Sequence, residues 1–143
     1  MEREHCVVSY KVRKRLVRRS TLDDSTFTGC LKVQYLLTNA VKFVAPELAP
    51  RVQVWTEPAR RENGDHKWVR IWVQDNGLGI APKHQSRIFR MFERVHPVEK
   101  YGGTGIGLAI VQKAVERMGG RVGVQSSPGA GSKFWIELRE PSG

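Results

Sequence analysis

The sequence has few cysteines and no long hydrophobic stretch. Its two cysteines, Cys6 and Cys30, are too few for a disulfide framework and lack the paired spacing of a zinc site, so both are interpreted as reduced thiols. No apolar run approaches the roughly 18 residues that a membrane-spanning helix needs, and the N-terminal region is charged where a signal peptide is apolar. We therefore expect a cytoplasmic chain that makes no membrane contact of its own.

Acidic residues are also scarce. The chain has 14 acidic and 24 basic residues, a formal charge of +10, which predicts an anionic partner such as a nucleotide, a nucleic acid or an acidic protein surface. Much of the excess lies in residues 10–19, where basic and apolar residues alternate as in a strand or a solvated arm. Only Tyr10 is aromatic there, so this run offers no platform for stacked bases, and nucleic acid is not the expected partner.

A length of 143 residues with 40% hydrophobic residues suits one domain. We divide the chain into a basic N-terminal segment, residues 1–23, which reads as a first strand or an arm, and a domain over residues 24–140. The patterns predict helices over 28–44, 82–90 and 104–118, and strands over 52–56, 68–74, 121–126 and 132–138. This order of elements predicts a sheet with helices covering one face.

The first predicted helix contains a residue that its buried face does not require. Leu36, Leu37, Ala40, Val41 and Phe43 or Val44 recur at helical spacing and predict that face, yet Asn39 lies among them. Taken alone, Asn39 reads as a polar residue of the helix surface. In the third helix, Ala109, Ile110, Ala114 and Val115 predict the buried side, together with Ile106 and Met118.

Two glycine-bearing segments suggest a ligand. Residues 75–80, Asp-Asn-Gly-Leu-Gly-Ile, follow a predicted strand; they read either as a tight turn or as a place where a flat ligand approaches the backbone of Gly77 and Gly79. In the second reading Asp75 accepts a hydrogen bond from the amino group of an adenine, a contact worth about 1.5 to 3 kcal/mol.

The second segment, residues 103–108, is Gly-Thr-Gly-Ile-Gly-Leu and runs directly into a predicted helix. Unpaired N–H groups at a helix start hold phosphate. The Gly-Lys-Ser/Thr step of a Walker loop is absent, and no strand precedes the glycines as a dinucleotide fold requires. With adenine near Asp75 and phosphates here, Asn39 becomes a suitable ligand for magnesium, and Lys42, on the same side of its helix, a phosphate contact.

Five segments in this order resemble the ATP-binding catalytic domain of sensor histidine kinases, in the superfamily of gyrase, Hsp90 and MutL. The similarity is greatest to phytochrome-like and PAS-linked kinases. The segments are Asn39-Ala40-Val41-Lys42-Phe43, residues 75–80, Ile88-Phe89-Arg90-Met91-Phe92-Glu93-Arg94, residues 103–108, and Gly129-Ala130-Gly131-Ser132-Lys133-Phe134.

This resemblance implies an α/β fold, a two-layer sandwich of a mixed, mostly antiparallel sheet covered on one face by about three helices, known as the Bergerat ATP-binding fold. It implies that ATP and Mg²⁺ bind under a lid at about residues 95–103. By the family pattern Asp75 binds the adenine amino group, Asn39 the metal, Lys42 and Arg94 the phosphates, and Tyr101 the base or sugar. The other implied nucleotide contacts are Gly77, Gly79, Ile80, Gly103, Thr104, Gly105, Ile106, Gly107, Leu108 and Ser132.

Two departures from the family pattern qualify the expected activity. Tyr35 replaces the Asn or Glu that many family members carry one turn before the metal asparagine; a phenol is a poor base toward water at neutral pH, so slow ATP hydrolysis is expected. In the family the accepting histidine lies in a helical dimerisation domain ahead of this one, whereas here only residues 1–23 precede the match and His5 lies in the wrong sequence context. We therefore expect a module that phosphorylates a histidine on a separate domain or chain, upstream of a response regulator, and does not phosphorylate itself. The alternatives are an anti-sigma-factor-type serine kinase and a non-catalytic nucleotide-binding regulator.

Overall fold

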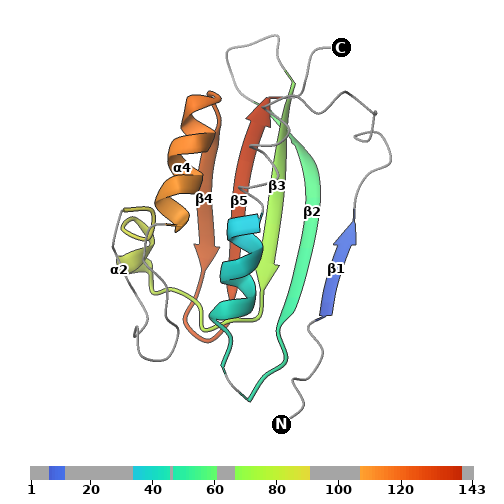
Figure 1. Cartoon of the computed structure of the whole chain (residues 1–143), viewed down its shortest axis with the longest axis vertical. Coiled ribbons are helices and arrows are strands. Elements are labelled where there is room, and N and C mark those ends of the chain that lie inside the picture. The colour runs from blue at the N-terminus through green and yellow to red at the C-terminus, as the bar shows by residue number, and fades with distance from the viewer. Residues whose placement is uncertain (1–6, 12–33, 46, 61–66, 91–106, 140–143) are drawn as a thin grey trace.

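A five-stranded sheet forms the framework of the molecule (Figure 1). The computed structural model describes residues 7–11, 34–45, 47–60, 67–90 and 107–139, and for 7–11 only the backbone. The strand order is β1-β2-β3-β5-β4, with β1 parallel to β2 and the other pairs antiparallel. The predicted mixed, mostly antiparallel sheet is therefore confirmed. Its strands are β1 (Val7–Lys11), β2 (Arg51–Ala59), β3 (Trp68–Asp75), β4 (Arg121–Ser126) and β5 (Ser132–Arg139).

Three helical segments lie within the described residues, all on one face of the sheet (Figure 1). They are a helix over residues 34–42, α2 (Pro82–Gln85) and α4 (Gly107–Arg117). Proline at the first position of α2 fits a helix start, where its missing N–H has no intrahelical partner to lose. None of the helices in the described ranges is long and apolar enough to cross a membrane.

The prediction of a helix over residues 82–90 was wrong in its length. After one turn the chain continues as successive tight turns, in which Arg87 N–H donates to the His84 carbonyl and Arg90 N–H to the Arg87 carbonyl. These bonds span three residues instead of four, so the α-helical pattern is not maintained. The side chain of Gln85 donates to the carbonyls of Ile80 and Ser126, which holds α2 against the end of β4.

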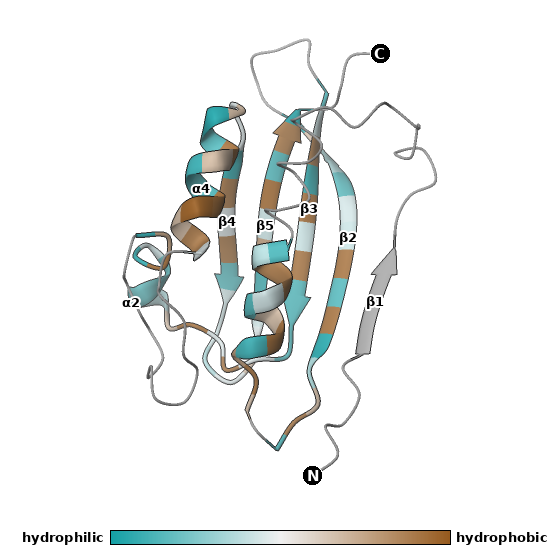
Figure 2. Ribbon diagram, in the orientation of Figure 1, coloured by the Kyte–Doolittle hydropathy of each residue, from teal (hydrophilic) through white to brown (hydrophobic). Residues whose placement is uncertain are grey.

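The hydrophobic core lies between the helices and the sheet. Apolar residues alternate with polar ones along β2, β3 and β5 (Figure 2), so that every second side chain faces the helices. The buried cluster combines strand residues with residues of the helix and loop layer. Its members are Leu36, Ala40, Val52, Val73, Ile80, Ile88, Val111, Val115, Phe134 and Ile136.

Most described residues of the two predicted helix faces are buried or half-buried, but in each helix one predicted residue is exposed. Leu36 and Ala40 of the first helix and Val44, two residues after it, are buried as predicted, while Val41 is 41% exposed. In α4, Ala109 and Val115 are buried as predicted, but Val111 is buried in place of the neighbouring Ile110, which is 39% exposed. Adjacent apolar residues lie about 100° apart on a helix, so only one of each pair can face the sheet.

Candidate functional site

The carboxylate of Asp75 lies at the end of β3, where the strand turns into residues 76–80. Its Oδ1 accepts hydrogen bonds from the backbone N–H groups of Gly77, at 2.9 Å, and Ser132, at 3.1 Å. Burial raises the pKa of Asp75 above its usual value, and the two hydrogen bonds oppose that rise. Oδ2 has no hydrogen-bond partner among the described residues, so one acceptor of a half-buried carboxylate remains available to a ligand.

Gly77 and Gly79 are required by the close approach of other backbone segments. A Cβ at Gly77 would lie 2.5 Å from the Phe43 carbonyl oxygen, and one at Gly79, whose φ is +74°, 1.9 Å from that of Ser127. The tight-turn interpretation thus accounts for both glycines without a ligand. Leu78 is hydrogen-bonded on both sides, donating to the Phe43 carbonyl and accepting from Gly129 N–H. The segment is therefore fixed between the first helix and the β4–β5 turn.

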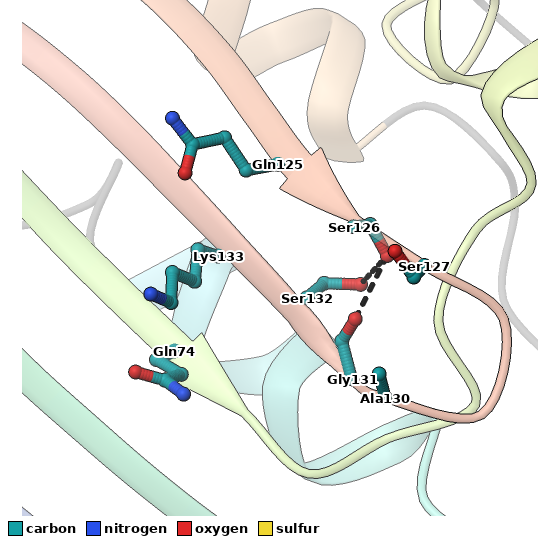
Figure 3. Close-up of a pocket in the computed structure, with 8 residues that line it drawn as sticks. All are labelled: Gln74, Gln125, Ser126, Ser127, Ala130, Gly131, Ser132 and Lys133. Carbon is teal, nitrogen blue, oxygen red and sulfur yellow. Dashed lines mark hydrogen bonds between the residues drawn. The ribbon is translucent and has the colours of Figure 1, made fainter.

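The side chain of Ser126 is hydrogen-bonded to the other end of residues 76–80, at Ile80. Its Oγ accepts from the backbone N–H of Ile80 at 2.8 Å and lies 2.9 Å from the Gly131 carbonyl oxygen and 2.8 Å from Ser132 Oγ (Figure 3). With Ser132 as donor and Gly131 as acceptor, all three contacts of one hydroxyl are satisfied. Ser126 was not among the residues predicted for the site. The available signal was its position opposite Ser132 across the turn between two predicted strands.

Asn39 and Lys42 are half-buried on the helix over residues 34–42. The Asn39 carboxamide makes no hydrogen bond within the described part of the chain, and Lys42 Nζ lies 5.2 Å from the centroid of the Phe43 ring. The same helix reaches the start of α4, because a Cβ at Gly107 would lie 3.4 Å from a ring carbon of Tyr35, one turn before Asn39. The helix thus touches residues 77–78 at one end and the start of α4 at the other.

The remaining predicted ligand contacts divide into two groups. Ile80 is 8% exposed and belongs to the core, Leu108 packs partly against the core, and Ser132 is buried and donates its N–H to Asp75. No group of three or more His, Cys, Asp or Glu side chains suited to a metal occurs in the described ranges. The predicted residues that lie outside these ranges are Arg94, Tyr101, Gly103, Thr104, Gly105 and Ile106.

Curated proteins similar in sequence include proteins named as phytochromes and as sensor histidine kinases. The chain is 41% identical over 105 residues to "Phytochrome-like protein Cph1" of Synechocystis sp., covering 73% of this chain and 13% of that protein. It is 44% identical over 105 residues to "Sensor histidine kinase AruS" of Pseudomonas aeruginosa, covering 72% of this chain and 10% of that protein. The chain thus spans about a tenth of the length of these relatives.

Solved structures of similar fold include full-length ShkA in complex with AMPPNP, with a TM-score of 0.71 and 29% identity over 96% of this chain and 26% of that one. The mycobacterial sensor histidine kinase MprB gives a TM-score of 0.65 and 25% identity over 92% of this chain and 81% of that one. The family described as "Histidine kinase-, DNA gyrase B-, and HSP90-like ATPase" matches residues 32–142. The resemblance stated from the sequence motifs is confirmed: the chain belongs to the histidine kinase-, DNA gyrase B- and HSP90-like ATPase family.

Proposed function

We propose that the chain binds Mg-ATP and donates the γ-phosphoryl group to a histidine on a separate domain or chain. The observation that carries this proposal is the state of Asp75. Its Oδ1 is held by two backbone N–H groups, while Oδ2 lacks a partner in the described residues. A carboxylate fixed in this way is an acceptor directed by the fold, which suits recognition of the adenine amino group.

Asn39 and Lys42 supply chemistry suited to the phosphate end of the nucleotide. An ammonium and a carboxamide that are half-buried and unengaged by other described polar groups are available to an anion and to its counterion. The start of α4, beside Tyr35, adds backbone N–H groups of the kind that bind phosphate. In this proposal Arg94, Tyr101 and residues 103–106 complete the contacts to phosphate, sugar and base.

Magnesium would enter with the nucleotide. Asn39 would hold the ion, since a neutral carboxamide oxygen is a suitable ligand for this hard cation. When bound, Mg²⁺ neutralises charge on the phosphates. The protein contributes position: Asp75 fixes the base, and Lys42 with Arg94 fixes the phosphates relative to the incoming histidine, which is the main requirement of phosphoryl transfer.

The acceptor in this proposal is the histidine of a helical dimerisation domain, and the phosphoryl group passes on to a response regulator. The family and the named sensor-kinase relatives support this assignment. Tyr35 supports transfer over hydrolysis, because a phenol is a weak base toward water at neutral pH. We propose that the chain alone does not phosphorylate itself.

Calorimetric titration with ATP, with and without Mg²⁺, tests the first half of the proposal. Absence of binding at millimolar nucleotide would overturn it. Mass spectrometry after incubation with ATP and a separately made histidine-bearing domain tests the second half. Acid-labile phosphate on that domain is the expected result. Acid-stable phosphoserine on a partner would identify a serine kinase of the anti-sigma-factor type, and binding without transfer a non-catalytic regulator.

A further inference from the structure

The face of the sheet opposite the helices has an ordered arrangement of side chains. All four tryptophans of the chain occupy strand positions on this face: Trp55, Trp68, Trp72 and Trp135. Three of them form one row, because Trp55 is paired with Trp72 and Trp72 with Trp135, and Gly123 completes the row on β4. No described helix covers this side of the sheet, so these large aromatic residues are not explained by the core.

The row beside the tryptophans is held rigid by charge. Glu137 is only 1% exposed and accepts hydrogen bonds from Arg70 at 2.7 and 3.1 Å and from Arg121 at 3.1 Å. The Arg70 guanidinium carbon lies 4.3 Å from the ring centroid of Trp135 and 5.4 Å from that of Trp72. A buried carboxylate shared between two guanidinium groups fixes both of them, so the face is preorganised.

The row on the other side of the tryptophans contains one lysine among three glutamines. Gln53, Gln74, Lys133 and Gln125 are paired in register across β2, β3, β5 and β4. Figure 3 shows Gln74, Lys133 and Gln125 side by side on three strands, lining a cavity of about 220 Å³ that the β4–β5 turn closes at one end. Lys133 is half-buried and has no ion-pair partner among the described residues. Its nearest neighbours in the row are neutral amides, which do not balance its charge.

An apolar surface adjoins this cavity. A Cβ at Gly123 would lie 2.3 to 2.6 Å from ring atoms of Trp135, so the indole lies directly over the backbone of β4. Trp135 is half-buried. The cavity and this indole follow one another along β5, two residues apart, on the same face. A ligand that joins a carboxylate to an apolar side chain a few ångströms away matches both.

We propose that this face, defined by the row Gln53–Gln74–Lys133–Gln125 and the row Trp55–Trp72–Trp135, docks an acidic segment of a partner protein. A carboxylate of that segment binds Lys133 in the cavity between Gln74 and Gln125, and a neighbouring apolar side chain packs on Trp135. Tryptophan and arginine are the residues most enriched at the energetic centres of protein interfaces. This function is independent of nucleotide binding, because Lys133 points away from the helix layer.

Charge determines the choice of partner. Strand residues on this face include five basic side chains and two acidic ones, and a second copy of a chain with a net charge of +10 would present the same excess. Nucleic acid is disfavoured because stacked bases need open ring faces. Here Trp55 and Trp72 stack on each other, with centroids 5.9 Å apart and planes 13° apart, and Trp72 is 6% exposed. The charged residues are Arg51, Arg70, Arg121, Lys133 and Arg139, with Glu57 and Glu137.

Tryptophan fluorescence tests the proposal directly, because every tryptophan of the chain lies on the proposed face. The probes are a short peptide in which glutamates flank a leucine and a phenylalanine, the same peptide with glutamine for each glutamate, and single-stranded oligothymidylate. The acidic peptide is expected to change the emission saturably, and the glutamine peptide to bind more weakly by about tenfold or more. Lys133→Glu is expected to abolish the response to the acidic peptide.

Lys113→Glu is the matched control, since Lys113 is exposed on α4, on the helix side of the sheet. It makes the same change in net charge and is expected to leave peptide binding unchanged. Lys133→Gln removes the charge without reversing it and extends the row of amides. It serves as a second variant in case the Lys133→Glu protein misfolds. If the Lys113 and Lys133 variants lose the same affinity for the acidic peptide, the effect comes from the overall charge of the protein, and the proposal is overturned. No response to the acidic peptide, or tighter Lys133-dependent binding of oligothymidylate, would also overturn it. Unchanged ATP titrations of Lys133→Glu would separate this face from the nucleotide site.

Discussion

Replacing Asp75 by asparagine separates its two roles. The retained Oδ1 can still accept from Gly77 and Ser132, so the turn should persist. A neutral acceptor weakens each of these bonds by about 1 kcal/mol, and removing a charge penalised by burial offsets part of that loss. Asp75→Ala, in contrast, leaves both N–H groups without their acceptor, at about 1 to 3 kcal/mol each. Urea denaturation should therefore rank the asparagine variant close to the parent and the alanine variant well below it.

The same substitution should have a more specific effect on nucleotide binding. Position Oδ2 becomes an NH₂ group, which faces the adenine amino group donor to donor. Loss of a charge-assisted bond worth about 1.5 to 3 kcal/mol weakens ATP binding by about 10- to 100-fold. Inosine triphosphate carries a 6-oxo group instead of the amino group, so the variant amide can donate to it. Titration of both proteins with both nucleotides should show a preference of the parent for ATP that shrinks or reverses in Asp75→Asn.

Equal weakening of ATP and inosine triphosphate would refute this reasoning. It would mean that Asp75 shapes the turn and does not read the base. Unchanged affinity for both nucleotides, in a variant of near-parental stability, would remove Asp75 from the ligand site altogether. Because the fold is monitored separately by urea denaturation, neither result can be attributed to unfolding.

Three further predictions concern the same region. Gly79→Ala should lower the free energy of unfolding by more than the roughly 1 to 2 kcal/mol expected for Gly129→Ala. Both glycines have φ near +75°, but a Cβ at Gly79 would meet a backbone oxygen, whereas nothing lies within 4 Å of one at Gly129. Urea denaturation of the two variants measures the difference. Because the pKa of Asp75 is raised in the folded state, the folded state binds a proton on this carboxyl more tightly than the unfolded state does. The stability gained from this proton is present below the unfolded pKa of 3.8 and is lost as the pH rises through the folded pKa. Asp75→Asn should lack this pH dependence in acid denaturation curves. Asn39→Asp, which adds a charged oxygen ligand, should change the Mg²⁺ concentration required for ATP binding in calorimetry.

The positions of the strands along the chain were the most predictable part of the fold. The predicted strands over residues 121–126 and 132–138 match β4 and β5 within one residue, because each alternates apolar and polar positions and a Pro-Gly turn separates them. The strands predicted over residues 52–56 and 68–74 lie within β2 and β3, which pair antiparallel, although β2 continues three residues further to Ala59. Successive side chains of a strand point to opposite faces of the sheet, so a strand has only two possible buried faces. The face that carries the more apolar residues is the buried one.

Helix phase was less predictable. Residues 40–41 and 110–111 are adjacent apolar pairs, and a pattern that allows either member cannot say which one faces the sheet. The choice depends on how each helix crosses the strands, which is a property of the assembled layers. Val44 and Val111 are buried because their positions continue the stripes that begin at Leu36 and Leu108, whereas Val41 and Ile110 fall outside those stripes.

The candidate site shows a different limit, because a residue type can be required for two reasons at once. Gly77 and Gly79 look like ligand-binding glycines in the sequence, yet the oxygens of Phe43 and Ser127 occupy the space that side chains there would need. A conformational argument from glycine therefore cannot by itself establish a ligand. Asp75 is more informative, since a fold that needed only a capped turn would be served by Oδ1 alone or by an asparagine amide. A desolvated carboxylate with an acceptor left over is explained by a donor that arrives with the ligand.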